Sequence, residues 1–394
     1  MNIVEPIFVQ CRNKPTEIAL CAPGTNFDLV SYGRLSRSVN NVCQRVVSAG
    51  LTPQNRVAVF IDDPIFHAIV LIALTRLGVV TVSGRARNFS WRFAIDAIIS
   101  DKPFLYPAGR IILANYDWTS GDGRPPEQKH FYRAAADDLC RIFLNSGTTG
   151  EEKGIAVTHR MMAARIDHQN LFFGPQAPFC ARTYLDLPLT TSLGFQVLLA
   201  TLRRGGALLM TGDPEKTIKA IPTYKVQNMV GSQQSLLNFV EAIERRPGYR
   251  CGLEAVFSEG SGLSESLSER VCARVCSNLT MGYGSTEAAM VASMPAHFAQ
   301  GNAGAAGYVL PGITVEIVEE GGRMVPSGEN GIVRIQSEYG VSEYLEDPEE
   351  TQRVFHNGWF YPGDLGCLTK ENMLIISGKI ERAKLSELVE SKSY

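Results

Sequence analysis

The sequence predicts an α/β protein with mainly parallel sheets and a smaller antiparallel part. Residues 56–82 have the pattern strand, helix, strand, which is the order of a βαβ unit and therefore of parallel strands. Strand-like and helix-like segments continue to alternate between residues 141 and 257. From Gly304 onward, short strand-like runs are separated by Gly and Pro turns, which favours antiparallel strands.

The first third of the chain supplies the opening βαβ unit. Apolar residues at helical spacing predict a helix over residues 32–49, and Gly50 is a C-terminal cap signal. The apolar run 56–61 predicts a strand, residues 65–77 predict a helix that ends at Gly78, and residues 79–82 predict a second strand. The segment 118–128 is rich in Gly, Pro, Ser and Asp and is expected to be loose.

The rest of the chain continues the alternation of strands and helices and then contains mainly strands. Strands are expected over 141–144, 183–187, 207–210, 228–230 and 255–257, and helices over 159–170, 193–203, 214–223 and 233–243. Later strands are expected over 313–318, 331–336 and 373–376. We therefore expect an α/β body over 1–302 made of two subdomains, a β-rich subdomain over 303–377, and a final segment over 378–394.

The charge balance excludes two classes of protein. The chain has 394 residues, with 38 Lys and Arg against 40 Asp and Glu, and a net charge of -2. Proteins that coat nucleic acid or bind membranes through polybasic surfaces need a concentrated positive field, which this balance does not supply. Because 45% of the residues are hydrophobic, the chain can build cores and is not disordered. A globular enzyme or binding protein of two or three domains remains, at roughly 100–200 residues per domain.

The nine cysteines are scattered and include no Cys-x-x-Cys pair. Cys272 and Cys276 have helical spacing in a predicted helix, but two thiols without a nearby His or second pair make a poor zinc site. We expect buried free thiols and a reducing, cytoplasmic environment. The first ten residues do not resemble a signal peptide, and the apolar stretch 68–82 is too short for a bilayer span.

The strongest local motif is Asn-Ser-Gly-Thr-Thr-Gly-Glu-Glu-Lys-Gly at residues 145–154, directly after a predicted strand. Its glycines let the backbone turn and present N–H groups, its hydroxyls add donors, and Lys153 adds positive charge. This combination predicts polyphosphate binding. The spacing is not that of a Walker P-loop, and a flexible surface turn is the alternative interpretation.

Two further motifs lie nearer the C-terminal end. Residues 281–287, Met-Gly-Tyr-Gly-Ser-Thr-Glu, combine an aromatic ring, a hydroxyl and a carboxylate, which could stack on a base, touch a phosphate and bind Mg²⁺. Residues 358–366, Gly-Trp-Phe-Tyr-Pro-Gly-Asp-Leu-Gly, place Asp364 between glycines, where it could bind a diol such as ribose. Ordinary turns with an exposed acid are the alternative in both cases.

Together, in this order, the three motifs resemble those of the adenylate-forming superfamily, which contains acyl- and aryl-CoA synthetases, adenylation domains of peptide synthetases, and luciferases. Residues 32–35 with 50–57, the Gly-rich segment 259–264, and segments 304–312 and 326–331 are similar to further parts of that family. The resemblance extends from about residue 5 to residue 382. It implies the family's large N-terminal domain, with two mainly parallel βα sheets and a small antiparallel, barrel-like subdomain.

The resemblance also implies a nucleotide site. Lys153, Thr286 and Glu287 would be catalytic, with Thr286 at the α-phosphate and Glu287 as the Mg²⁺ ligand. Asp364 would take the ribose hydroxyls, and Lys379 would stand where the family usually has an arginine. The remaining cofactor-binding residues would contact the β- and γ-phosphates or flank adenine; they are Ser146, Gly147, Thr148, Thr149, Gly150, Gly260, Ser261, Gly262, Tyr283 and Gly284.

The implied reaction is attack of a substrate carboxylate on the α-phosphate of ATP, which releases pyrophosphate and leaves an acyl-adenylate. A second step would pass the acyl group to CoA or to a phosphopantetheine carrier. The implied partners are a small carboxylic acid and a carrier protein, without nucleic acid. By position, residues 193–199, 230–236 and 257–262 would build the acyl pocket. No aspartate opens the region around Phe195, which makes amino acids less expected than medium-chain or aromatic acids.

The sequence departs from the family pattern at several positions. Glu152 replaces the proline of the phosphate loop, Pro362 replaces a threonine, and the aromatic–His pair expected near Thr190 and Thr191 is absent. After Arg382 the match stops, so we expect the family's small C-terminal domain and its lysine to have no counterpart in these residues. Loss of one such charged group costs on the order of 10²–10³-fold in rate.

Two functions therefore stay open. The first is an acyl-CoA-synthetase-like ligase that needs a separate small domain for full activity. The second is a truncated, non-catalytic or regulatory protein that binds a nucleotide or an acyl ligand. A dehydrogenase or a kinase is disfavoured, because no Gly-x-Gly-x-x-Gly follows a strand and no His-Arg-Asp loop occurs.

Overall fold

The structure is a computed structural model that describes residues 2–82, 84, 92–103, 110–127, 130–146, 152–172, 181–260 and 262–380. The chain divides into two compact units. Unit 1 comprises Met1–Asp167 and Pro178–Val226, and unit 2 comprises His168–Ala177 and Gln227–Tyr394. Each unit is described by itself.

Unit 1 contains a six-stranded sheet in the order β6-β5-β3-β4-β7-β8. Its strands are parallel except for the antiparallel pair β7–β8. They are β3 (Arg56–Phe60), β4 (Val80–Val82), β5 (Ala97–Ser100), β6 (Arg110–Leu113), β7 (Leu139–Ser146) and β8 (Glu152–Thr158). The βαβ unit predicted over 56–82 is confirmed as β3, α3 (Pro64–Arg76) and β4, with Asp63 capping the helix through the amides of Ile65 and Phe66.

A second group of strands in unit 1 consists of β9, β10 and β1, which are parallel, and β2, which is antiparallel to β1. Their bounds are β1 (Ile18–Cys21), β2 (Leu29–Ser31), β9 (Arg182–Asp186) and β10 (Ala207–Leu209). The remaining helices of unit 1 are α1 (Glu5–Asn13), α2 (Tyr32–Ser48), α5 (Ser192–Arg203) and α6 (Pro214–Tyr224). Helix α4 (His159–Phe172) begins in unit 1, and its residues from His168 onward belong to unit 2. Helix α2 packs on α3, and α5 packs on β9 and β10.

A completely buried arginine lies in the core of unit 1. Arg141 in β7 donates hydrogen bonds to Thr81 Oγ1 at 3.0 Å and to the Leu189 carbonyl at 2.8 Å. Its guanidinium stands 4.3 Å from the centre of the Phe195 ring, a cation–π contact. Burial lowers the pKa of Arg141 to about 9. The two acceptors fix the guanidinium between β4 and the segment that precedes α5.

Unit 2 begins with parallel strands and continues as an antiparallel sheet. Strands β11, β12 and β13 are parallel and in register, and every later pairing is antiparallel within the described residues. The order is β18-β19-β17-β20-β21-β15-β14-β13-β12-β11, with β16 paired to β17. The strands are β11 (Asn228–Ser232), β12 (Ala255–Glu259), β13 (Leu279–Ser285), β14 (Ala289–Pro295), β15 (Ala305–Val309), β16 (Ile313–Val318), β17 (Gly331–Ser337), β18 (Phe355–His356), β19 (Trp359–Phe360), β20 (Asp364–Leu368) and β21 (Met373–Lys379).

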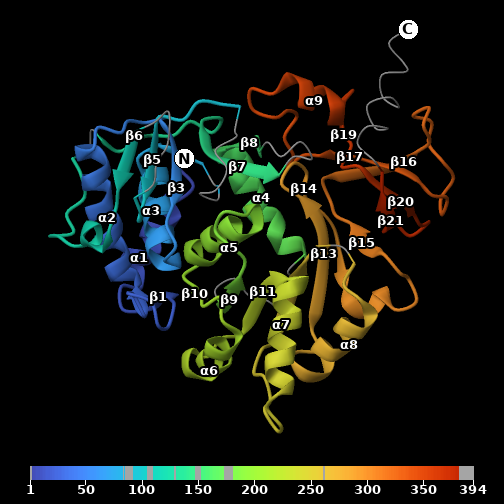
Figure 1. Cartoon of the computed structure of the whole chain (residues 1–394), viewed down its shortest axis with the longest axis horizontal. Coiled ribbons are helices and arrows are strands. Elements are labelled where there is room, and N and C mark those ends of the chain that lie inside the picture. The colour runs from blue at the N-terminus through green and yellow to red at the C-terminus, as the bar shows by residue number, and fades with distance from the viewer. Residues whose placement is uncertain are drawn as a thin grey trace. The chain divides into compact units, whose positions relative to one another are not determined.

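Two helices accompany the parallel strands of unit 2. Helix α7 (Gln233–Glu244) packs on β11 and β12, and α8 (Glu265–Arg274) packs on α7 and β13, as Figure 1 shows. A short helix, α9 (Pro348–Val354), precedes β18. The antiparallel strands predicted after Gly304 are present, but antiparallel pairing begins earlier than predicted, because β14 already pairs antiparallel with β13. In the described residues these strands form an open sheet rather than the barrel-like subdomain that the resemblance implied.

Two local expectations were wrong. Helix α8 ends at Arg274, so Cys276 lies beyond the helix that was expected to carry both Cys272 and Cys276. The segment 118–127 is held rather than loose, because side-chain amides of α2 donate to its carbonyls. These bonds run from Asn40 to Gly123 (2.9 Å), from Asn41 to Thr119 (2.8 Å) and from Gln44 to Arg124 (2.7 Å). In the described part of the chain, no helix has the length and apolar character needed to cross a bilayer.

Candidate active site

Three predicted site residues of unit 2 form one cluster. Tyr283 lies in β13, and Asp364 and Lys379 face each other as an antiparallel pair at the ends of β20 and β21. The Tyr283 hydroxyl donates to Asp364 Oδ2 at 2.6 Å, and Lys379 Nζ lies 3.2 Å from Asp364 Oδ1. The structure thus joins the motif at 281–287 to the motif at 358–366.

The cluster is a buried carboxylate held by one buried and one exposed donor. Tyr283 and Asp364 are 7% and 5% exposed, whereas the Lys379 side chain is 79% exposed. Burial, followed by the Asp364 charge, raises the pKa of Tyr283 well above its usual value, so the phenol keeps its proton. Each carboxylate oxygen has two acceptor sites, so Asp364 retains the capacity to accept hydroxyl groups of a ligand.

Glu287 lies in the turn between β13 and β14, directly after Thr286. Its Oε1 accepts a hydrogen bond from the Tyr344 hydroxyl at 2.8 Å, and its carbonyl accepts from the Val341 amide at 2.9 Å. Tyr344 was not predicted, because no motif in the sequence connects it to Glu287. The loop after β17 therefore orients the proposed metal ligand.

A cavity of about 310 Å³ lies beside Glu287. Its walls include Ser337, Gly340 and Gly358–Phe360 of the predicted Gly-Asp motif. No group of three or more metal-binding side chains occurs among the described residues. A single carboxylate still fits Mg²⁺, which is usually held by one or two carboxylates, by water and by substrate phosphates.

The predicted glycine turn follows β12. Gly260 adopts φ +102°, and its amide donates to the Gly282 carbonyl at 2.9 Å, so the turn lies against the start of the Tyr283 motif. Gly284 is required for a different reason: an added Cβ would lie 2.4 Å from the Ala289 carbonyl oxygen of β14. Gly262 is also described, whereas Ser261 lies outside the described residues.

The predicted phosphate loop connects β7 and β8 in unit 1. In that antiparallel pair, Asn145 faces Lys153 and Ser146 faces Glu152, so both ends of the loop are defined. The Lys153 side chain is 5% exposed. The remaining predicted loop residues lie outside the described part of the chain, as does the side chain of Ser146; they are Gly147, Thr148, Thr149 and Gly150.

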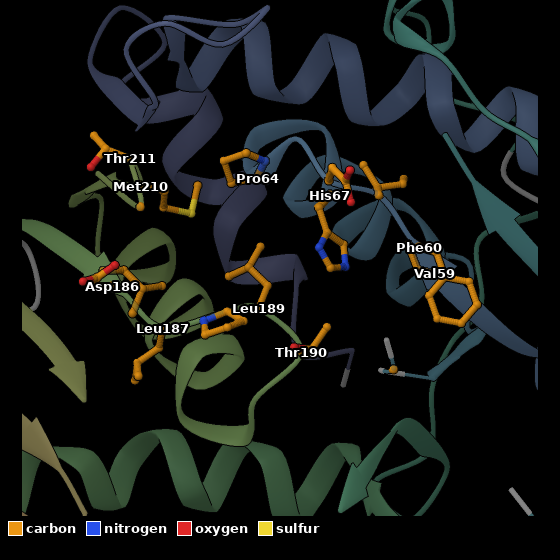
Figure 2. Close-up of a pocket in the computed structure, with 16 residues that line it drawn as sticks. Val59, Phe60, Pro64, His67, Asp186, Leu187, Leu189, Thr190, Met210 and Thr211 are labelled. Carbon is orange, nitrogen blue, oxygen red and sulfur yellow. The ribbon is translucent and has the colours of Figure 1, made fainter. Parts of the chain in front are cut away.

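Unit 1 also contains a cavity of about 700 Å³ at the carboxyl ends of β3, β9 and β10. Figure 2 shows the side chains of His67, Leu189 and Met210 around it. Burial, helped by the charge of Arg141, lowers the pKa of His67 to about 3, so its imidazole is neutral. The described residues that line this cavity include none of the predicted site residues.

The chain matches one family over most of its length. The family described as "AMP-binding enzyme" matches residues 100–345. The 4-coumarate--CoA ligase 2 of Solanum tuberosum is 30% identical over 275 residues, which are 66% of this chain and 49% of that protein. The feruloyl-CoA synthase of an Amycolatopsis species is 25% identical over 389 residues, which are 91% of this chain and 74% of that protein. The match thus spans about half the length of the potato ligase.

The fold is also found among solved structures. The O-succinylbenzoate coenzyme A synthetase of Bacillus subtilis, solved in complex with AMP, aligns with a TM-score of 0.80 at 17% identity. The alignment covers 95% of this chain and 78% of that chain. At this identity the likeness shows the fold alone, which is the mixed α/β N-terminal domain that the motifs implied.

Proposed function

The chain belongs to the AMP-binding enzyme family, within the adenylate-forming superfamily, and on that premise we propose that it activates a carboxylic acid with ATP. In this reaction a carboxylate oxygen bonds to the α-phosphorus of ATP, and the bond from that phosphorus to the β-phosphate oxygen breaks. The products are an acyl-adenylate and pyrophosphate. The observation that carries the proposal is the buried Tyr283–Asp364 hydrogen bond, which unites two of the three nucleotide motifs.

The proposed residues around the phosphates would stabilise negative charge during this reaction. Two anions must approach each other, so cations and backbone dipoles fixed at the phosphates lower the barrier most. Lys153 and the loop 146–150 would bind the β- and γ-phosphates, and Thr286 would donate to the α-phosphate. Glu287, oriented by Tyr344, would hold Mg²⁺, which when bound would neutralise phosphate charge.

The nucleoside would be held by unit 2. Asp364 would accept the ribose hydroxyls while Tyr283 and Lys379 keep its carboxylate in place. The turn 260–262 and the Tyr283 ring would flank adenine. Two relatives are named for 4-coumarate and feruloyl-CoA, so aromatic acids are the first substrates to test and CoA is the proposed acceptor, with a phosphopantetheine carrier as the alternative.

Exchange of labelled pyrophosphate into ATP tests the proposal. A panel of carboxylic acids is assayed with this chain alone and again after addition of a second chain that carries the family's small C-terminal domain. We include the second chain because full activity is proposed to require that domain. Replacing Asp364 by Asn should raise KM for ATP about 10- to 100-fold, because hydrogen bonds to a charged group contribute about 1.5–3 kcal/mol. The exposed Glu371→Ala variant is the control and should behave as wild type.

The competing function is a non-catalytic or regulatory binding protein, favoured by Glu152 in place of the loop proline. Calorimetric binding of ATP or AMP, weakened by the Asp364 variant, without exchange for any acid even after a small-domain chain is added, would replace the enzyme proposal with this one.

A further inference from the structure

Glu259 is a half-buried carboxylate at the end of a parallel strand. It is the last residue of β12, and within the described part of the chain its carboxylate accepts no hydrogen bond and forms no ion pair. Burial alone raises the pKa of Glu259 to about 7. Withdrawing a carboxylate from water without a polar partner is unfavourable, so a ligand that supplies the partner would be favoured.

The register of the parallel strands defines which face carries this carboxylate. Ser232 of β11 pairs with Glu259 of β12, and Glu259 pairs with Gly282 of β13, so these three positions belong to the same face of the sheet. A Cβ added at Gly282 would lie 2.6 Å from the Phe257 ring and 2.8 Å from the Met290 sulfur. Apolar side chains thus lie on the face of the sheet that carries Glu259.

Tyr283 follows Gly282 along β13, so its side chain leaves the opposite face of the sheet, where it meets Asp364. The proposed ribose side and Glu259 thus lie on opposite faces of the same strand ends. These are carboxyl ends of parallel strands, the edge at which α/β sheets commonly bind ligands. The neighbouring turn offers room, because a Cβ added at Gly260 or Gly262 would meet no described atom within 4 Å.

We propose that Glu259 is a specificity-determining residue that selects carboxylic acids bearing a protonated amine, with which its carboxylate would pair. This inference rests on the proposed function and names the class of acid. A charge-assisted hydrogen bond to an ammonium would offset the desolvation of Glu259, whereas an uncharged acid would leave it unpaired. Amino acids were disfavoured for lack of an aspartate near Phe195, but Glu259 supplies a carboxylate from a different element.

Matched pairs of acids test the inference with the full chain. The pairs are aminocaproate with heptanoate and para-aminomethylbenzoate with para-ethylbenzoate, which differ in charge but hardly in size. The amine of each pair should be favoured about 10- to 100-fold in kcat/KM for pyrophosphate exchange. Glu259→Gln should lose that preference, and Glu259→Asp should keep part of it. Glu254→Gln, at an exposed glutamate next to the start of β12, is the matched control and should keep all of it.

The outcomes separate this inference from the proposed function. Exchange with the uncharged acids as strong as with the amines overturns the inference and leaves acid activation in place. If no acid supports exchange, calorimetric titration of the same pairs into the AMP-saturated chain is decisive. Tighter binding of the amines that is lost in Glu259→Gln supports the inference without the reaction, and equal or weaker binding overturns it.

Discussion

Tyr283→Phe removes one hydroxyl from the centre of the proposed site and changes almost nothing else. Phenylalanine fills the same space, so no cavity forms, but the 2.6 Å hydrogen bond to Asp364 is lost. Hydrogen bonds to charged groups contribute about 1.5–3 kcal/mol, and this one joins two buried groups. We therefore expect the free energy of unfolding to fall by about 2 kcal/mol in the ligand-free chain.

Lys379 provides the internal comparison. Its ammonium lies 3.2 Å from the same carboxylate, but its side chain is 79% exposed, and exposed ion pairs contribute at most about 1 kcal/mol. Lys379→Met should therefore destabilise the protein less than Tyr283→Phe. Tyr283→Phe should have the larger effect on stability because Tyr283 is buried. The Lys379 contact with Asp364 is longer, and the Lys379 side chain is exposed to solvent.

Urea unfolding measures both variants, together with Asp364→Ala and the double variant Tyr283→Phe/Asp364→Ala. Circular dichroism and tryptophan fluorescence should give coincident transitions before a free energy is extracted, because the chain has two units. The double-mutant cycle isolates the coupling between Tyr283 and Asp364. A coupling below about 0.5 kcal/mol, or a larger loss in Lys379→Met, would refute the reasoning.

Three further predictions use the same unfolding assay. Burial raises the pKa of Glu259 from its ordinary value of 4.5 to about 7, so the folded chain binds more protons than the unfolded chain between those pH values and becomes less stable as pH rises through them. The free energy of unfolding of Glu259→Gln should thus exceed that of wild type by up to about 3 kcal/mol above pH 7 and equal it below pH 4.5. A difference in free energy that does not change with pH would count against this explanation. Gly366→Ala should cost at least about 1–3 kcal/mol, because its Cβ would lie 2.2 Å from a β21 carbonyl oxygen, whereas Gly252→Ala, in open space, should be near neutral. Arg141→Lys should cost about 1–3 kcal/mol, since an ammonium cannot reproduce the fork that reaches both acceptors, and an unchanged midpoint would contradict that account.

The sequence was sufficient where local pattern and tertiary structure agree. The run at 56–61 and the helix that ends before Gly78 predict β3 and α3 because their apolar residues are buried in one core. The same applies to the antiparallel strands after Gly304. The end of helix α8 was harder to predict, because the apolar residues keep their helical spacing as far as Val275 although the helix ends at Arg274.

The site was predictable as motifs but not as contacts. Asp364 and Tyr283 were assigned separately to ribose and adenine, and nothing in the sequence indicates that they share a hydrogen bond. Tyr344 escaped prediction because its contact with Glu287 depends on the path of the loop after β17. The desolvation of Glu259 comes from burial in the folded chain, and so no motif in the sequence indicates it.

The Tyr283–Asp364 bond also has a consequence for synthesis on the ribosome. The phenol is made 81 residues before its acceptor, so a growing chain completes β13 long before β20 exists. Until Asp364 emerges, the Tyr283 hydroxyl lacks its folded-state acceptor, and burying it without a partner is unfavourable. Completion of the proposed nucleotide site would therefore be a late event in synthesis, and pausing within residues 284–363 would hold the nascent protein in a state that lacks the Asp364 part of that site.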